Sequence, residues 1–203
     1  SRQLMATLKL LEDKGMTPKH FTALLASGIL ADVVDSNADL GNREAVRIAL
    51  KLGAVMPEIF RLTVDYGQSL EEMVVAGRYD QRDNSITAKR FPIVGKGVVG
   101  FEGRYFQFGR DISSENVIKE IEAADSENPW SVAKIEHLLS FGEKFPEKQR
   151  KYSIIALGSV AKVLGCQLVP VLYGVGSKRR FCLYWFGPVL EAVFRFLAVR
   201  KVS

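Results

Sequence analysis

The sequence is poor in the residues that build metal centres and disulfide scaffolds. Its 203 residues include two cysteines and two histidines. Cys166 and Cys182 lack the CxxC or Cys/His spacing of a zinc site, so we expect two buried thiols rather than a disulfide framework or a redox pair. His20 and His137 stand on two separate predicted helices, and two histidines are too few for a multi-histidine metal site. We therefore predict no metal, no cofactor and no catalytic residue.

Long hydrophobic runs are also missing. Arg, Lys, Gly or Pro interrupts every apolar stretch well before the roughly 20 residues that a membrane-spanning helix needs. No basic-then-apolar leader follows Ser1, so we expect no secretory signal, although the sequence does not decide whether Ser1 is the native start. With 47% hydrophobic residues the chain can bury a core of one or two domains. We expect a soluble, cytoplasmic protein that does not enter a membrane.

The first part of the chain has the pattern of a small helical module. Leu4, Leu8 and Leu11 recur at helical spacing, and Thr17-Pro18 is typical of an N-cap followed by proline in the first turn. Asn42 can cap a third helix that ends before Gly53. The composition changes near Pro57. These signals predict a helical module over residues 1–54 and an α+β domain over residues 55–203.

The middle of the chain alternates strand and helix patterns. Residues 59–64 alternate apolar and polar side chains, and residues 98–108 predict one long strand or a strand pair. Ser69 with Glu72 predicts a capping box on a helix over residues 70–76. Serine caps and periodic apolar residues predict two further helices, over residues 114–124, capped by Ser113 or Ser114, and over residues 131–141, with Ser131 as cap and Gly142 as terminator.

The last quarter of the chain predicts a sheet. β-branched and aromatic runs separated by glycine give four strands, over residues 153–162, 167–173, 180–186 and 193–200. Leu164-Gly165 predicts a tight hairpin turn, and Gly174, Gly176 and Ser177 predict a second one. The fold class is therefore α+β, with a mainly antiparallel C-terminal sheet covered by the 114–124 and 131–141 helices.

Charge is concentrated in the same quarter. Residues 152–203 hold seven basic side chains against one acid, a net charge of +6, while the whole chain has +5. Basic side chains neutralise phosphates, and aromatic faces on a sheet stack unpaired bases. We therefore predict a non-catalytic protein that binds RNA or DNA, with single-stranded or structured RNA favoured. The candidate nucleic-acid-binding residues are Lys178, Arg179, Arg180, Tyr184, Trp185 and Arg195.

Other interpretations stay open. Alternation places Trp185 and Tyr184 on opposite faces of one strand, and one of those faces must be core. The basic residues can also protect edge strands from pairing. The polar Arg78–Arg90 loop, with Asp80 and Asp83, is the candidate site of a phosphodiester hydrolase. The N-terminal helices can serve as a protein-interaction adaptor. The sequence does not fix the ligand, the biological role or the oligomeric state.

Four stretches carry a resemblance that extends from about Tyr66 to the end of the chain. They are GRYDQRDNSITAKRFP, RYFQFGRDISS, IIALGSVA and the terminal FRFLAVRK. The chain resembles an uncharacterised group of hypothetical proteins encoded in genomes of candidate-phylum bacteria, in which a similar tail ends the chain. No function is known for that group. The resemblance therefore implies no activity and assigns no catalytic residue.

Overall fold

The structure is a computed structural model that describes residues 58–202. This part of the chain is α+β, with four helices and a nine-stranded mixed sheet. No helix in residues 58–202 is long and apolar enough to cross a membrane. The helical module predicted over residues 1–54 lies outside the described residues, so it stays a prediction.

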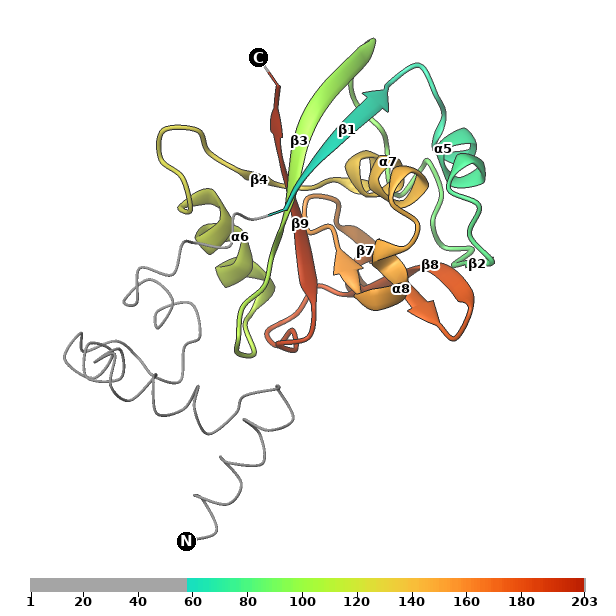
Figure 1. Ribbon diagram of the computed structural model, residues 1–203. Coiled ribbons are helices and arrows are strands. Elements are labelled where there is room, and N and C mark those ends of the chain that lie inside the picture. The colour runs from blue at the N-terminus through green and yellow to red at the C-terminus, as the bar shows by residue number, and fades with distance from the viewer. Residues whose placement is uncertain (1–57, 203) are drawn as a thin grey trace, which may run out of the picture. The chain divides into compact units, whose positions relative to one another are not determined.

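The sheet has the strand order β1-β3-β9-β5-β7-β8-β2, with β4 pairing to β9 and β6 pairing to β7 (Figure 1). Its strands are β1 (Ile59–Asp65), β2 (Gln81–Arg82), β3 (Val98–Phe106), β4 (Ser131–Val132), β5 (Ile154–Ile155), β6 (Ala161–Val163), β7 (Cys166–Val175), β8 (Lys178–Trp185) and β9 (Arg195–Lys201). The helices are α5 (Leu70–Ala76), α6 (Ser114–Glu122), α7 (Ile135–Lys144) and α8 (Lys148–Lys151).

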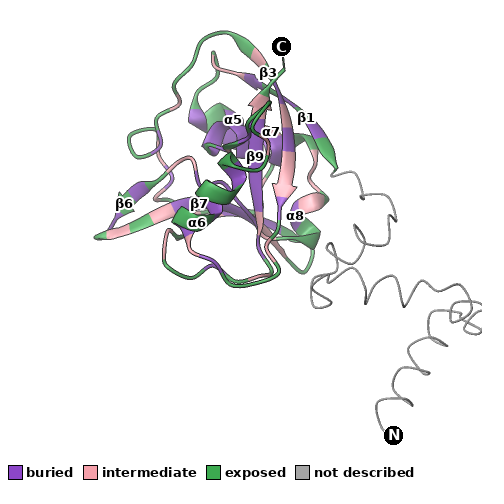
Figure 2. Ribbon diagram, turned by 90° about the vertical axis from the view of Figure 1, so that its left-hand side faces the viewer, coloured by how far each residue is buried: buried purple, intermediate pink, exposed green. Residues whose placement is uncertain are grey.

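Each face of the sheet carries its own core. Because side chains alternate along a strand, Phe181 of β8 and Leu197 of β9 point to one face, where they join α5 and α7 in the larger cluster. Phe196 and Ala198 point to the other face and join Val117 and Ile121 of α6. We call these the α7 face and the α6 face. Buried residues run through β9 because both of its faces are covered (Figure 2).

Local capping signals in the sequence are confirmed. Ser69 caps α5, and the Glu72 carboxylate accepts a hydrogen bond from the Ser69 backbone N–H at 2.7 Å, which completes the capping box. Ser113 caps α6 and accepts a hydrogen bond from the backbone N–H of Asn116 at 3.2 Å. Residues 98–106 form one continuous strand rather than a strand pair.

The predicted start of the third described helix is wrong. Ser131 is not an N-cap, because Ser131 and Val132 form β4 and pair with Val199 and Ala198 of β9. The helix α7 begins four residues later, where the Ile135 N–H donates to the Ser159 hydroxyl at 2.9 Å. Gly142 is therefore inside α7 instead of ending it.

Both hairpin turns are confirmed, although Gly174 lies in β7 and pairs with Arg179 instead of standing in the second turn. The predicted length of one strand is wrong. Leu164 and Gly165 both have positive φ, 50° and 88°, in the β6–β7 turn, and Gly176 has φ 57° in the β7–β8 turn. The strand predicted over residues 153–162 is broken into β5 and β6. The sheet is mixed, because β5 runs parallel to β9 and β2 runs parallel to β8.

Candidate nucleic-acid interface

The structure does not bring the six predicted binding residues together on one surface. Along β8, Lys178, Arg180 and Tyr184 point to the α6 face, and Arg179 and Trp185 point to the α7 face. Lys178 and Trp185 stand at opposite ends of the strand. Only part of the predicted set can therefore meet a single ligand.

Arg179 is buried, with 6% of its surface exposed, and its guanidinium is used inside the protein. It donates to the Gly77 carbonyl at 2.7 Å, to the Gly142 carbonyl and to the Gln149 side-chain oxygen at 3.0 Å. The carbonyls of Gly77 and Gly142 lie at the C-terminal ends of α5 and α7, where a positive charge is favourable. Gln149 belongs to α8. Burial lowers the pKa of Arg179, partly offset by nearby Tyr79. Arg179 is a clamp between β8 and three helices.

Arg195 lies on the α7 face of β9, away from Lys178, Arg180 and Tyr184. Its guanidinium is 4.7 Å from the centre of the Tyr152 ring and donates to the Val193 carbonyl at 3.4 Å. Partial burial lowers the pKa of Arg195, and nearby Tyr152 partly offsets this by raising it. This position stacks Arg195 on an aromatic ring of its own chain.

The α6 face of the β6–β7–β8 ribbon carries an aromatic–basic stripe. The strand register places Tyr173 opposite Arg180, with the Arg180 guanidinium 6.0 Å from the Tyr173 ring centre, and Lys162 opposite Gln167. Tyr184 packs on Phe194 at 4.9 Å, so it is half-buried. Along β8 the stripe is roughly 25 Å long. Its members are Lys162, Gln167, Tyr173, Lys178, Arg180, Tyr184 and Phe186.

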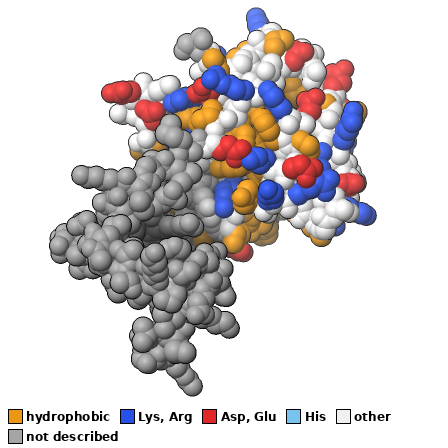
Figure 3. Space-filling view, viewed as in Figure 1, with side chains coloured by type: hydrophobic (Ala, Val, Ile, Leu, Met, Phe, Trp, Pro, Cys, Tyr) orange, Lys and Arg blue, Asp and Glu red, His pale blue; other side chains and the backbone are white. Residues whose placement is uncertain are grey.

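The strands that form the stripe carry no acidic side chain. No Asp or Glu occurs in the sequence between Glu147 and Glu191. Within residues 58–202, Lys162, Lys178 and Arg180 form no ion pair. On the face that Figure 3 shows, by contrast, Lys and Arg side chains are interspersed with acidic ones. Within the described residues, no ion pair therefore neutralises the positive charge of the stripe, which leaves it able to attract an anionic ligand.

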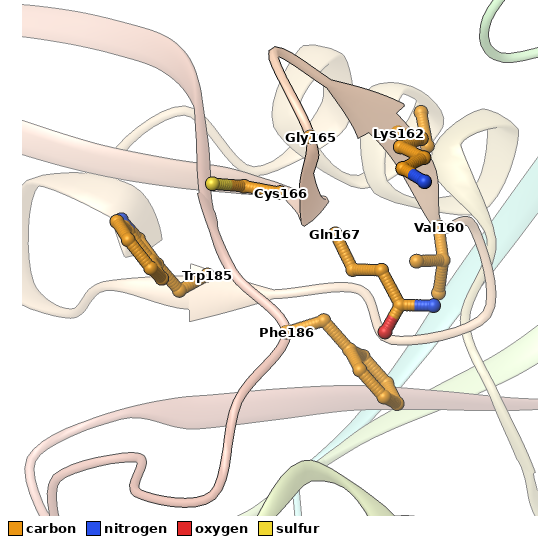
Figure 4. A pocket seen from close by; sticks show the side chains of 8 residues that line it. Val160, Lys162, Gly165, Cys166, Gln167, Trp185 and Phe186 are labelled. Carbon is orange, nitrogen blue, oxygen red and sulfur yellow. The ribbon is translucent and has the colours of Figure 1, made fainter.

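An open groove of about 640 Å³ lies at one end of the stripe. Lys162 and Gln167 form its wall on the α6 face with Phe186, whose backbone N–H donates to the Gln167 carbonyl at 2.9 Å (Figure 4). Trp185 lies away from them across the strand, with 65% of its surface exposed. The groove thus joins the stripe to the one predicted aromatic residue that is largely open to solvent.

The polar Arg78–Arg90 loop uses its two carboxylates locally. Asp80 accepts a hydrogen bond from the Arg179 backbone N–H at 2.6 Å, and Asp83 accepts one from the Ser85 backbone N–H at 2.7 Å. Short strand β2 in this loop pairs with β8. Among residues 58–202 no three His, Cys, Asp or Glu side chains gather in a way that could hold a metal ion. The loop is organised as an edge of the sheet.

Four members of the stripe were not singled out from the sequence: Lys162, Gln167, Tyr173 and Phe186. Alternation along one strand already places Phe186 on the face of Tyr184, whereas Lys162, Gln167 and Tyr173 need the register of two hairpins, which the Leu164-Gly165 and Gly176 turns fix. Once the register is known, alternation places all four on the face of Arg180.

Comparison with known proteins adds no further assignment. No model of a protein family matches the chain, and neither a curated protein nor a solved structure is significantly similar to it.

Proposed function

We propose that this protein is a non-catalytic, single-strand-selective nucleic-acid-binding protein, with RNA favoured, and that the aromatic–basic stripe is its binding surface. The observation that carries the proposal is the combination, on one half-open sheet face, of a row of aromatic rings and three basic side chains that form no ion pair within residues 58–202. Unpaired bases stack on such surfaces, whereas the stacked bases of a duplex do not present their faces.

Different residues supply the phosphate contacts and the stacking contacts of this surface. Lys162, Lys178 and Arg180 supply positive charge over the length of the ribbon, so they contact phosphates. Trp185 is not a member of the stripe, but it lines the groove at the end of the stripe and has an exposed ring, on which one stacked base contributes about 1–3 kcal/mol. Tyr184 is half-buried against Phe194, so its contribution is smaller.

The proposal predicts how binding depends on salt. The triple variant Lys162→Ala/Lys178→Ala/Arg180→Ala removes three phosphate contacts, each of which contributes about 0.7 to the slope of log affinity against log salt on a single strand. The slope should therefore fall by about 2 units. Fluorescence anisotropy with a labelled oligonucleotide of about 12 nucleotides, over a salt series, measures it on the full chain.

A matched variant separates local contact from net charge. Lys89→Ala/Arg110→Ala/Lys119→Ala removes the same charge from exposed positions off the stripe, and the slope should stay within about 0.5 of the wild-type value. Trp185→Ala should reduce affinity at every salt concentration without changing the slope. If micromolar wild-type protein binds no oligonucleotide at about 50 mM salt, the stripe only protects the sheet edge.

A further inference from the structure

A second pocket lies on the opposite face of the sheet, at the N-terminal end of α7. Its volume is about 320 Å³, near the lower limit for small-molecule sites. Lysines reach it from three segments: Lys96 from the loop before β3, Lys134 from the residue before α7, and Lys201 from the end of β9. Within residues 58–202 none of the three forms an ion pair.

The walls of this pocket are aromatic and firmly placed. The ring of Tyr66 lies against the backbone of Gly95, where an added Cβ would stand 2.2 Å from it. The Tyr66 backbone N–H donates to the Gly97 carbonyl at 2.9 Å, and Gly97 takes a positive φ of 66° that suits glycine. Phe101 forms another wall and meets the His137 ring edge-on at 4.5 Å.

His137, which lines the pocket, has a hydrogen-bond donor without a partner in the described residues. It is 6% exposed and lines the pocket, and its Nδ1 accepts the Lys134 backbone N–H at 3.0 Å. Because Nδ1 is an acceptor, the proton of the neutral ring is on Nε2. That nitrogen is buried and has no hydrogen-bond partner in residues 58–202. Burial, together with the charge of Lys134, lowers the His137 pKa to about 4, which keeps the ring neutral near pH 7.

The charges of the pocket lining indicate which kind of ligand could accept a hydrogen bond there. Three lysines face one carboxylate, Glu136, which is buried and whose pKa is raised mainly by desolvation. The lining therefore favours a ligand with about two negative charges, and a phosphate monoester has about −1.5 to −2 at pH 7. The N-terminus of α7 adds to the same attraction. Tyr66 and Phe101 supply contacts for an apolar or planar body attached to the phosphate.

We propose that this pocket binds a small organic phosphate, with His137 Nε2–H as donor to a phosphate oxygen and Lys96, Lys134 and Lys201 as its counter-charges. The site is independent of the aromatic–basic stripe, because Phe101 belongs to the core of the α7 face and His137 packs against Phe101. Either site can therefore fail without the other.

Phenyl phosphate is a suitable probe, because it combines the phosphate with an aromatic body. Isothermal titration of the full chain should give saturable binding with Kd below about 1 mM, and benzoate should bind about tenfold more weakly. Lys96→Ala/Lys201→Ala should weaken phenyl phosphate binding at least about tenfold, because two charged contacts are lost. Lys162→Ala removes a charge from the other site and should leave Kd unchanged.

Two substitutions at His137 test the donor while accounting for the fold. His137→Asn keeps an acceptor near the position of Nδ1 and removes the Nε2–H, so binding should weaken by about tenfold while the cap of α7 persists. His137→Gln places an amide N–H near Nε2 and should retain more affinity than His137→Asn. No saturable binding of phenyl phosphate up to about 10 mM, or equal binding by wild type and the Lys96/Lys201 variant, overturns the proposal. Binding only to oligonucleotides with a terminal phosphate also overturns the assignment to a small molecule.

Discussion

Replacing Arg179 with alanine should destabilise the described domain by about 4 kcal/mol, although the sequence suggests a surface residue. The guanidinium bonds to two backbone carbonyls, Gly77 and Gly142, and to the side chain of Gln149. Each buried acceptor that loses its donor costs about 1–3 kcal/mol. Relaxation and entering water offset part of the total, which sets the expected value towards the lower end of the sum.

Arg180 is the matched control. It carries the same charge on the neighbouring residue, but its side chain makes no hydrogen bond in residues 58–202 and its guanidinium only approaches the Tyr173 ring. Arg180→Ala should therefore cost less than about 1 kcal/mol. Arg179→Lys should fall between the two alanine variants, because an ammonium cannot reproduce the planar fork of the guanidinium.

Urea denaturation followed by tryptophan fluorescence measures these differences. The chain has two tryptophans, Trp130 and Trp185, and both lie in the described residues, so the signal reports on this domain. If Arg179→Ala and Arg180→Ala change the free energy of unfolding equally, or Arg179→Ala costs under about 1 kcal/mol, the clamp is refuted. At a temperature where it is folded, Arg179→Ala should also leave the salt slope of nucleic-acid binding unchanged.

Two further predictions concern close packing and protonation. Gly158→Ala should cost about 2 kcal/mol by the same assay, because its Cβ would stand 2.8 Å from the carbonyl oxygens of both Val132 and Ala133, whereas Gly109→Ala, with nothing within 4 Å, should be near neutral. The pKa of His137 falls to about 4 in the folded state, while an unfolded histidine titrates near 6.5, so acid favours the unfolded chain between these values and stability should drop by about 3 kcal/mol from pH 6.5 to 4. Subtracting the pH profile of His137→Asn isolates this contribution from that of Glu136, and identical profiles would contradict it.

Local chemistry made part of the fold predictable from the sequence. The Ser69–Glu72 capping box depends on residues three positions apart, and the Leu164-Gly165 turn depends on adjacent ones. Such signals act within a few residues, so tertiary structure did not override them. The α+β class followed from the same local patterns.

Long-range partners explain the errors. The N-cap assigned to Ser131 fails because Ser131 pairs with Val199 of β9, and the true first N–H of α7, on Ile135, finds its acceptor on Ser159. The parallel pairing of β5 with β9 likewise joins segments that no local pattern connects. A sequence read in short windows contains neither partner.

Long-range partners also decide the roles of two adjacent residues of the candidate site, Arg179 and Arg180. Alternation predicts that Arg179 and Arg180 point to opposite faces of the sheet. It does not identify which face offers buried hydrogen-bond acceptors to a guanidinium. The answer depends on Gly77, Gly142 and Gln149, which are far from Arg179 in sequence and reach it only through the packing of three helices. The count of basic residues in the last quarter of the chain therefore overestimates the number of basic side chains on its surface.

The fate of each basic side chain sets a quantitative limit on the proposed function. Of the seven basic residues in the C-terminal quarter, Arg179 is buried as a clamp and Arg200 is paired with Glu102 at 2.9 Å and Asp125 at 3.3 Å. Arg195 stacks on Tyr152, and Lys201 lines the pocket on the α7 face. Three remain on the stripe, so this surface accounts for a salt slope of about 2 on a single strand rather than the value near 5 that all seven would give. A wild-type slope well above 2 that persists in the triple variant would mean that other basic residues hold the nucleic acid, and the stripe would then lose its role.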